Sequence, residues 1–301
     1  MASETQNPQL ESFFQVLKLA NYQGFWYMPA QVENIKKFQT QYEAFDDDVL
    51  LASPLKTGTA WCKALIASIM NPGEDILPQK MIHGHVPNLE NAVYGAKPVQ
   101  QEPYPLEKAF EGFCEGVLPY GPFFEHILEY WNESIKFPQK ILFLKFEDLK
   151  NDPKTQVKKL ASFLGKSIDD EEIDAILYRC SFKRLKDLEV NQNGGGEWAN
   201  GIVVPFSSFF RKGDVGDWKN HFTTEMGERL EQIAKDKLKG TGLNLTCEAL
   251  KLRTTCSGVW SSHIICGDSN GRLGADGDTL AAVSLVVDIA EKKFWLFDVS
   301  L

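Results

Sequence analysis

Residues 48–61 read DVLLASPLKTGTAW, an apolar run followed by a loop of small residues and the start of a helical pattern. The run shows no polar alternation and is bounded by a loop, which is typical of a buried strand. The helical pattern covers 61–70 and is ended by Asn71-Pro72-Gly73. Strand, loop and helix in this order open a βα unit, so we predict a buried strand over 48–53 in an α/β fold.

The loop between this strand and helix carries candidate anion-binding groups. The N-terminus of a helix presents free backbone N–H groups and positive dipole charge, both of which favour a phosphate. Lys56 adds a point charge, and Thr57 and Thr59 add hydroxyl donors. The spacing differs from the G-x-x-x-x-G-K-[ST] loop of nucleoside triphosphatases. On these residues alone, a helix-capping turn with an exposed lysine stays open beside phosphate binding.

The rest of the first 245 residues reads as helices around a second buried strand. Residues 12–43 suggest a short helix and then an irregular segment, and 140–146 (KILFLKF) predict the second strand. Helices are predicted over 106–117, 122–136, 153–164, 167–178 and from 223 or 224 to 238. Gly194-Gly195-Gly196 predicts a mobile loop.

After about residue 245 the composition shifts. A hairpin over 257–273 with Asn270-Gly271 at its turn, a helix over 278–291 and a strand over 294–298 predict a small ββαβ tail. We therefore divide the chain into an N-terminal segment (1–44), a main domain (45–245) and a tail (246–301).

Composition narrows the class of protein. The 301 residues are 43% hydrophobic and 24% charged, with a formal net charge of −9, as in an ordinary globular protein with an acidic surface. That charge argues against nucleic acid and anionic membranes as partners. We find neither a signal peptide nor an apolar run of membrane-spanning length, and we expect a cytoplasmic protein. The six cysteines form no C-x-x-C pair, so we expect no metal.

Two further segments carry chemical groups that are ambiguous alone. His83-Gly84-His85 places two histidines at i, i+2, which are most often surface residues. Residues 210–218 read FRKGDVGDW, where adjacent Arg211 and Lys212 suit a phosphate but equally suit a solvated turn.

Taken together, these segments resemble the plant cytosolic sulfotransferases. The family's Y-P-K-[ST]-G-T-T-W loop corresponds to residues 54–61, its T-H-[LV]-P-Y stretch to 84–88, and its R-K-G-x-x-G-D-W-K-N element to 211–220. Four other stretches also match: FCEGVLPYGPF (113–123), LFLKFEDLKNDP (142–153), CSFKRLKDLEVNQ (180–192) and KLKGTGL (237–243). The resemblance covers about residues 45–243.

The resemblance implies a P-loop-like parallel sheet flanked by helices that binds 3′-phosphoadenosine 5′-phosphosulfate (PAPS), without a metal. It implies that His85 is the general base and that Lys56 stabilises the leaving group. The implied donor-binding residues are Lys56, Thr57, Gly58, Thr59, Ala60 and Trp61 in the loop, Phe146, Ser181 and Phe182 around the adenosine, and Arg211, Lys212 and Gly213 at the 3′-phosphate.

The sequence departs from the family pattern. Pro54-Leu55 stands where the family has an aromatic residue and proline, Ala60 replaces a loop threonine, and Phe146 replaces a tyrosine. No buried strand and no arginine lies between residues 86 and 139, so the central strand with its 3′-phosphate arginine and the following serine is expected to be missing. A catalytically degenerate protein without turnover is therefore the alternative function.

Three expectations remain. The tail vaguely resembles a truncated ribonuclease H-like module, but Val283 and Val299 stand where that family needs carboxylates, so we expect no nuclease activity. The acceptor is expected to be a small hydroxylated molecule such as a flavonoid, steroid or jasmonate. Residues 219–228 resemble the dimer motif of animal relatives, although a capped helix start explains them equally, so we expect a monomer or a weak homodimer.

Overall fold

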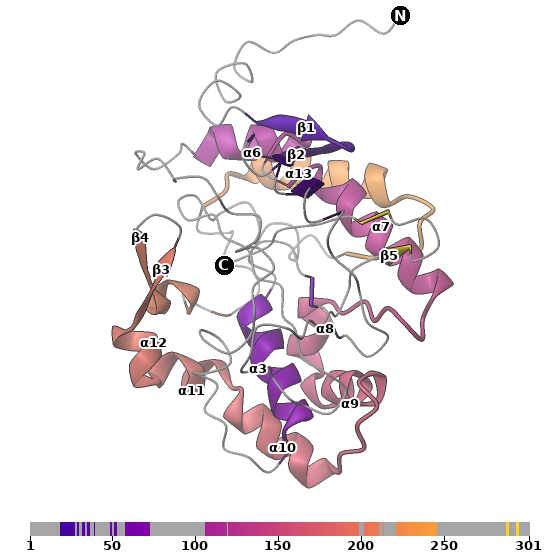
Figure 1. Cartoon of the computed structure of the whole chain (residues 1–301). Helices are drawn as coiled ribbons and strands as arrows, with labels where there is room; N and C mark the ends of the chain where they lie inside the picture. Colours follow the sequence, from indigo (N-terminus) through magenta and orange to yellow (C-terminus); the bar gives the residue numbers. More distant parts are fainter. Residues whose placement is uncertain are drawn as a thin grey trace, which may run out of the picture.

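The structure is a computed structural model, and it describes residues 19–27, 29, 32–33, 35–36, 39, 49, 51–52, 58–72, 106–118, 120–198, 202–210, 213, 221–245, 287–288 and 293–294. Within these ranges the main elements are helices in two groups (Figure 1). One group contains α3 (Thr59–Met70), α8 (Phe146–Asn151), α9 (Pro153–Phe163), α10 (Asp170–Arg179) and α11 (Phe182–Asp187). The other contains α6 (Leu106–Glu115), α7 (Phe123–Lys136) and α13 (Thr224–Leu238).

The first group encloses the larger core. Leu65 and Ile69 of α3 are fully buried against Leu149 of α8 and the apolar stripes of α9 and α10. Leu51 and Leu142, from the two apolar runs predicted as strands, are buried in the same core. The prediction of burial is therefore confirmed at Leu51, Ile141 and Leu142.

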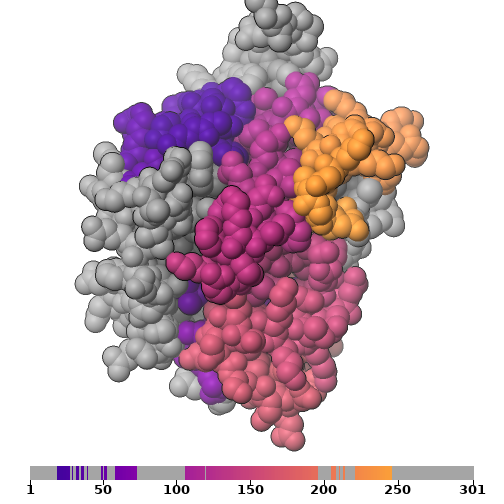
Figure 2. Space-filling model, turned by 90° about the vertical axis from the view of Figure 1, so that its right-hand side faces the viewer, coloured from indigo at the N-terminus to yellow at the C-terminus, as the bar shows by residue number. Residues whose placement is uncertain are grey.

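The second group has a core of its own, built mainly from aromatic rings. Phe110 and Phe113 of α6 pack on Phe123 and Phe124 of α7, and Leu230 of α13 is fully buried with them. In the space-filling view, the orange α13 segment lies against the magenta α6–α7 segment (Figure 2). The indole Nε1 of Trp131 donates to the Thr241 carbonyl at 2.9 Å, which holds the chain beyond α13 on α7.

Every sheet within the described ranges is a two-stranded antiparallel pair, so these residues do not form the predicted parallel sheet. Residues 49, 51–52 and 141–145 belong to no strand, and Phe146 begins α8 instead of ending a strand. The predicted strands 48–53 and 140–146 are therefore wrong for these residues. Apolar runs determine burial, but a strand also needs a backbone partner for its ladder. The segment of the expected missing strand (86–105) lies outside the described residues.

Two hairpins occupy places where we predicted irregular backbone. β1 (Ala20–Tyr22) pairs with β2 (Phe25–Tyr27) across Gln23 and Gly24, which both have positive φ, as a type I′ turn requires. β3 (Gly195–Trp198) pairs with β4 (Ile202–Pro205), so Gly195 and Gly196 of the predicted loop instead begin a strand, and Gly194 ends the helix before it. The hairpin β1–β2 packs Phe25 and Tyr27 on Tyr120 and Tyr130, forming a third, smaller core.

Two short helices were also missed. They are α11 and α12 (Glu189–Asn193). A 3₁₀ turn (Phe206–Phe209) follows β4. In the tail, β5 (Val287–Asp288) pairs with β6 (Lys293–Phe294). The predicted helix over 278–291 is therefore wrong at Val287 and Asp288. The predicted hairpin over 257–273 lies outside the described residues.

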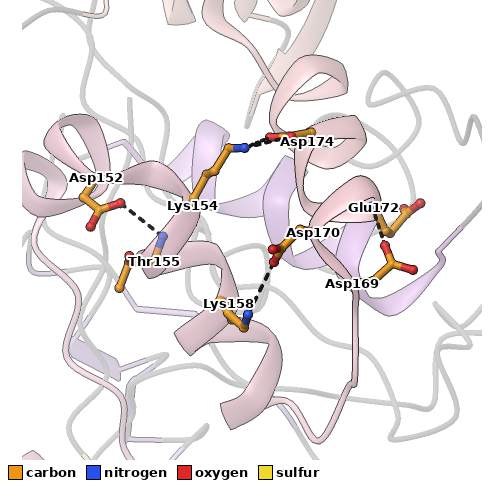
Figure 3. Close-up of polar contacts among 8 residues, drawn as sticks. All are labelled: Asp152, Lys154, Thr155, Lys158, Asp169, Asp170, Glu172 and Asp174. Atoms are coloured by element: carbon orange, nitrogen blue, oxygen red, sulfur yellow. Dashed lines mark hydrogen bonds and ion pairs between the residues drawn. The ribbon is translucent and has the colours of Figure 1, made fainter.

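Short polar residues cap three of the predicted helices, α9, α10 and α13. Asp152 accepts from the Thr155 N–H at 3.2 Å at the start of α9, where Pro153 takes the first helical position. Thr223 caps α13 in the same way. For α10 the cap is Asp169, which accepts from Glu172 N–H at 2.8 Å, so this helix begins later than the predicted residue 167. Lys154–Asp174 and Lys158–Asp170 ion pairs cross between α9 and α10 (Figure 3).

Candidate functional site: a nucleotide-binding corner at the start of α3

Gly58 shapes the turn that leads into α3. It has φ 96° and ψ 23°, in the left-handed region that favours glycine, and it is the residue before the first helical one. Its carbonyl accepts from the Cys62 N–H at 2.9 Å, which starts the helical ladder. Thr59, the first helical residue, is buried and Ala60 follows it half-buried. The turn therefore delivers the chain to a helix N-terminus, where backbone N–H groups can bind an anion.

The ring of Phe146 covers this turn. A Cβ built on Gly58 would lie 2.7 Å from Phe146 Cδ2, so glycine alone fits beneath the ring. The same ring meets Trp61 edge-on, with 5.8 Å between centroids and 74° between planes. Two aromatic side chains from segments 85 residues apart thus form a corner over the first turn of α3. This confirms none of the predicted contacts with a nucleotide, but it does bring three of the predicted donor-site residues together.

Trp61 also has an unused hydrogen-bond donor. Its Nε1 atom is buried and has no hydrogen-bond partner within the described ranges. A buried donor without a partner costs about 1–3 kcal/mol. An acceptor on a bound molecule can remove that cost, so the corner fits a ligand that offers both a flat ring and polar atoms, such as an adenine nucleotide.

A second aromatic contact lies at Gly213. This glycine has φ 69°, and a Cβ on it would lie 2.3 Å from Phe182 Cδ2. Phe182 also packs on Phe210, with 6.1 Å between ring centroids. The Ser181 hydroxyl caps α11 by accepting from Arg184 N–H at 3.4 Å, so its hydrogen stays free to donate outward. The structure thus brings the predicted residues Phe182 and Gly213 into contact.

Helix α8 contacts both glycine segments. Phe146, its first residue, covers Gly58, and Lys150, in its last turn, donates from Nζ to the Gly213 carbonyl at 2.8 Å. We did not predict a role for Lys150. Residues 146 and 150 are four apart and lie on one face of α8, but the predicted strand over 140–146 includes Phe146 and so conceals this spacing.

The thiols of this region are not nucleophiles. Cys62 follows Trp61 on α3, and burial raises the pKa of its thiol to about 12. Burial also raises the pKa of Cys180 to about 11, although the hydrogen bond with the Ser68 hydroxyl, at 3.3 Å between Sγ and Oγ, acts in the opposite direction. Both groups are therefore protonated at neutral pH, and the site's chemistry must come from other side chains.

Five predicted site residues lie outside the described residues: Lys56, Thr57, His85, Arg211 and Lys212. Their roles stay predictions, and so do the ligand contacts of the described ones. Burial also raises the pKa of Glu129 on α7 to about 6, with Glu125 and Glu133 adding to the effect. This carboxyl lies on the second helix group, away from the predicted site residues in the sequence. No helix in the described part of the chain is long and apolar enough to cross a membrane.

Comparisons with known proteins point to one family. The family model described as "Sulfotransferase domain" matches residues 91–242. Cytosolic sulfotransferase 10 of Arabidopsis thaliana is 32% identical over an aligned length of 299 residues, covering 75% of this chain and 88% of the relative. A flavonol sulfotransferase-like protein of Flaveria bidentis is 34% identical, covering 74% and 92%. The structure of a mouse sulfotransferase complexed with PAP is similar in fold, with a TM-score of 0.51 at 23% identity over 74% of this chain and 94% of that one.

Proposed function

Because the chain belongs to the sulfotransferase family, it transfers a sulfuryl group from PAPS to a hydroxyl, and we propose that the corner at the start of α3 is its donor site. The observation that carries this proposal is the packing of Phe146 on the left-handed Gly58. Only a residue without a side chain fits beneath the Phe146 ring. The left-handed backbone at this glycine leads the chain into the N-terminus of α3, where backbone N–H groups can bind a phosphate.

The donor is held, in this proposal, at three places. The loop residues Lys56, Thr57, Gly58, Thr59 and Ala60 bind the 5′-phosphate, the rings of Trp61, Phe146 and Phe182 with the Ser181 hydroxyl bind the adenosine, and Arg211, Lys212 and Gly213 bind the 3′-phosphate. The aromatic contacts of Trp61 with Phe146 and of Phe182 with Gly213 support the second and third groups.

The reaction needs one base and one leaving-group stabiliser. The acceptor oxygen attacks the sulfur of PAPS, and the bond between sulfur and the 5′-phosphate oxygen breaks. The hydroxyl proton passes to the imidazole of His85, and the Lys56 ammonium stabilises the negative charge that develops on the departing phosphate. The products are a sulfate ester and 3′-phosphoadenosine 5′-phosphate (PAP).

The acceptor in this proposal is a small hydroxylated molecule such as a flavonoid, a steroid or a jasmonate. The name of the Flaveria relative, a flavonol sulfotransferase-like protein, supports the flavonoid class. The word cytosolic in the names of the Arabidopsis relatives supports a cytoplasmic location. We propose a monomer or weak homodimer, with neither nucleic acid nor membrane as a partner.

We also propose that the chain lacks an internal segment of the family, the strand with the 3′-phosphate arginine and the serine that follows. The alignment with the Arabidopsis relative supports this, because it is 299 positions long while three quarters of 301 residues, about 226, are covered here. The relative therefore carries residues between matched positions that this chain does not have. A separate tail over 246–301 is part of the same proposal, and the family match that ends at residue 242 supports it.

The test is turnover with a histidine control. Purified protein is incubated with PAPS and a panel of flavonols, hydroxysteroids and a hydroxylated jasmonate, and PAP release and sulfated products are measured by mass spectrometry. We expect product with at least one acceptor, a loss of about 10²–10⁴-fold in His85→Asn, and a nearly normal rate in His83→Asn. A wild-type protein that binds PAP but sulfates nothing on the panel favours the degenerate alternative. The reverse ranking of the two histidines contradicts the role of His85.

A further inference from the structure

We infer that Lys150 is a positioning residue that fixes the segment binding the 3′-phosphate, and that it thereby sets the preference for nucleotides carrying that phosphate. The inference rests on the proposed function, since it refines the same donor site. It starts from a contact between two segments 63 residues apart, the hydrogen bond from Lys150 Nζ to the Gly213 carbonyl at 2.8 Å.

Gly213 is held from two sides. Lys150 binds its carbonyl, and the ring of Phe182 packs so closely on its α-carbon that a Cβ would lie 2.3 Å from a ring carbon. Its φ of 69° also restricts which backbone path can enter and leave it. These three constraints fix one peptide unit directly after Arg211 and Lys212.

The helix that carries Lys150 is itself fixed. Leu149 is 1% exposed and belongs to the larger core, and its N–H donates to the Lys145 carbonyl at 3.1 Å. Phe146, one turn before Lys150, covers Gly58. A single rigid helix therefore contacts the turn proposed for the 5′-phosphate and the segment proposed for the 3′-phosphate, and it sets the spacing between them.

The consequence concerns selectivity more than general stability. A forked or charge-assisted contact with a phosphate loses strength when its donor moves by a fraction of a bond length. Loss of the Gly213 anchor acts on the segment proposed to bind the 3′-phosphate, whereas the adenine corner of Trp61 and Phe146 keeps its own contacts. A nucleotide with a 3′-phosphate should therefore lose affinity while one without it does not.

The experiment compares PAP with adenosine 5′-monophosphate (AMP), which lacks the 3′-phosphate, by calorimetry on the full chain. In Lys150→Met we expect PAP affinity to fall about tenfold or more, and AMP affinity to change by less than about twofold. Lys150→Arg, which can still donate to the carbonyl, should stay within about threefold of wild type for both. Lys183→Met removes one exposed charge beside Phe182 in the sequence and should behave as wild type.

The outcomes separate the two proposals. Equal losses of affinity for PAP and AMP in Lys150→Met mean that the residue only stabilises the fold. Unchanged affinities for both nucleotides mean that it positions nothing. Either result overturns the inference alone. A wild-type protein that binds PAP no better than AMP overturns the proposed donor site and the inference with it. If Lys150→Met does not fold, Lys150→Gln carries the same test, because its neutral side chain is one bond shorter and does not reach the Gly213 carbonyl.

Discussion

Two features of Gly58 require glycine at this position. Its backbone is left-handed, and its α-carbon lies against the ring of Phe146. Some other glycines with positive φ, such as Gly165, have the left-handed backbone without a ring against the α-carbon. Gly165, at the end of α9, has φ 69° and nothing within 4 Å of a built Cβ, so it offers a matched comparison. The difference between the two positions isolates the effect of the Phe146 ring.

We expect Gly58→Ala to lower both stability and donor affinity, and Gly165→Ala to lower stability only. The left-handed backbone costs each alanine about 1–2 kcal/mol. At Gly58 the new methyl group must also displace Phe146, which we expect to weaken PAP binding about tenfold or more through the lost ring contact. Thermal melts and calorimetry measure the two effects. Equal PAP affinity in both variants would show that the ring position does not matter to the donor.

The resemblance predicted which residues form this corner, but not which of them contact one another. Gly58, Trp61 and Phe146 could be named from motif positions, because those motifs are local in sequence. That Phe146 rests on Gly58, and that Lys150 reaches Gly213, depends on contacts between distant segments, which no local pattern encodes. Lys150 was therefore missed, although it lies within the matching stretch 142–153.

At the scale of elements, capping residues and ion pairs contribute very differently to the α9–α10 pair. We expect Asp152→Ala to destabilise the protein by about 1 kcal/mol, because the cap satisfies a helix N–H that has no other partner in the helix. Lys158→Ala removes an ion pair between side chains that are 66% and 82% exposed, and should cost less than about 0.5 kcal/mol. Urea denaturation of both variants checks the order. A larger loss in Lys158→Ala would contradict it.

Helix α7 contains an acidic stripe that makes stability depend on pH. Glu129 has a pKa raised to about 6, mainly by burial and then by Glu125 and Glu133, and its Oε2 atom has no hydrogen-bond partner in the part of the chain described. The folded-state pKa lies above the unfolded value of about 4.3, so the folded state binds the proton more tightly. The penalty for the charged form is complete above pH 6 and disappears as the pH falls towards 4.

Glu129→Gln should therefore stabilise the protein at pH 7 and not at pH 4. The gain should not exceed about 1 kcal/mol, because the side chain is half-exposed and solvent screens part of the effect. Thermal melts at both pH values measure it. Glu228→Gln is the control, because Glu228 is exposed on α13, away from Glu129 in the sequence, and should gain nothing at pH 7. A gain of equal size at pH 4 would rule out the protonation of Glu129 as the cause.

The long helices were predictable, whereas the strands and the short helices were not, for a physical reason. Helical hydrogen bonds close within four residues, so apolar spacing and caps such as Asp152 and Thr223 mark helices locally. Strand bonds close with a partner elsewhere in the chain. Residues 141–145 are buried as predicted at Ile141 and Leu142, yet belong to no strand.

At the scale of the whole molecule, the larger core and the aromatic core are each built on separate helix groups. The proposed missing segment belongs between the histidine stretch and α6, that is, between the donor site and the second helix group. Its loss would shift Lys56 relative to His85 even if each core remained intact. A misplacement of about 1 Å in reacting groups can cost about 10²-fold in rate.

We therefore expect the chain to transfer sulfate at least about a hundredfold more slowly than a version with the family segment restored after Asn88. Both forms are expressed, and rates are compared at saturating PAPS, so that weaker donor binding does not enter. Parallel melting curves check that both forms are folded. Similar rates would mean that the segment is dispensable for catalysis.

The thiols of Cys62 and Cys114, which are half-buried, and of Cys180, which is buried, have a consequence for oxidation and covalent labelling. Burial raises their pKa values to about 12, 11 and 11, which disfavours the reactive thiolate form of each at pH 7. We expect iodoacetamide to leave the peptides containing these three cysteines unmodified in the native protein and to alkylate them in urea, as read by peptide mass spectrometry. Fast native labelling of Cys62 would show that the first turn of α3 opens to solvent. If the thiols stay protected, electrophilic inhibitors and mild oxidants will not reach the donor corner through its cysteines, so compounds against it must bind by shape and charge alone.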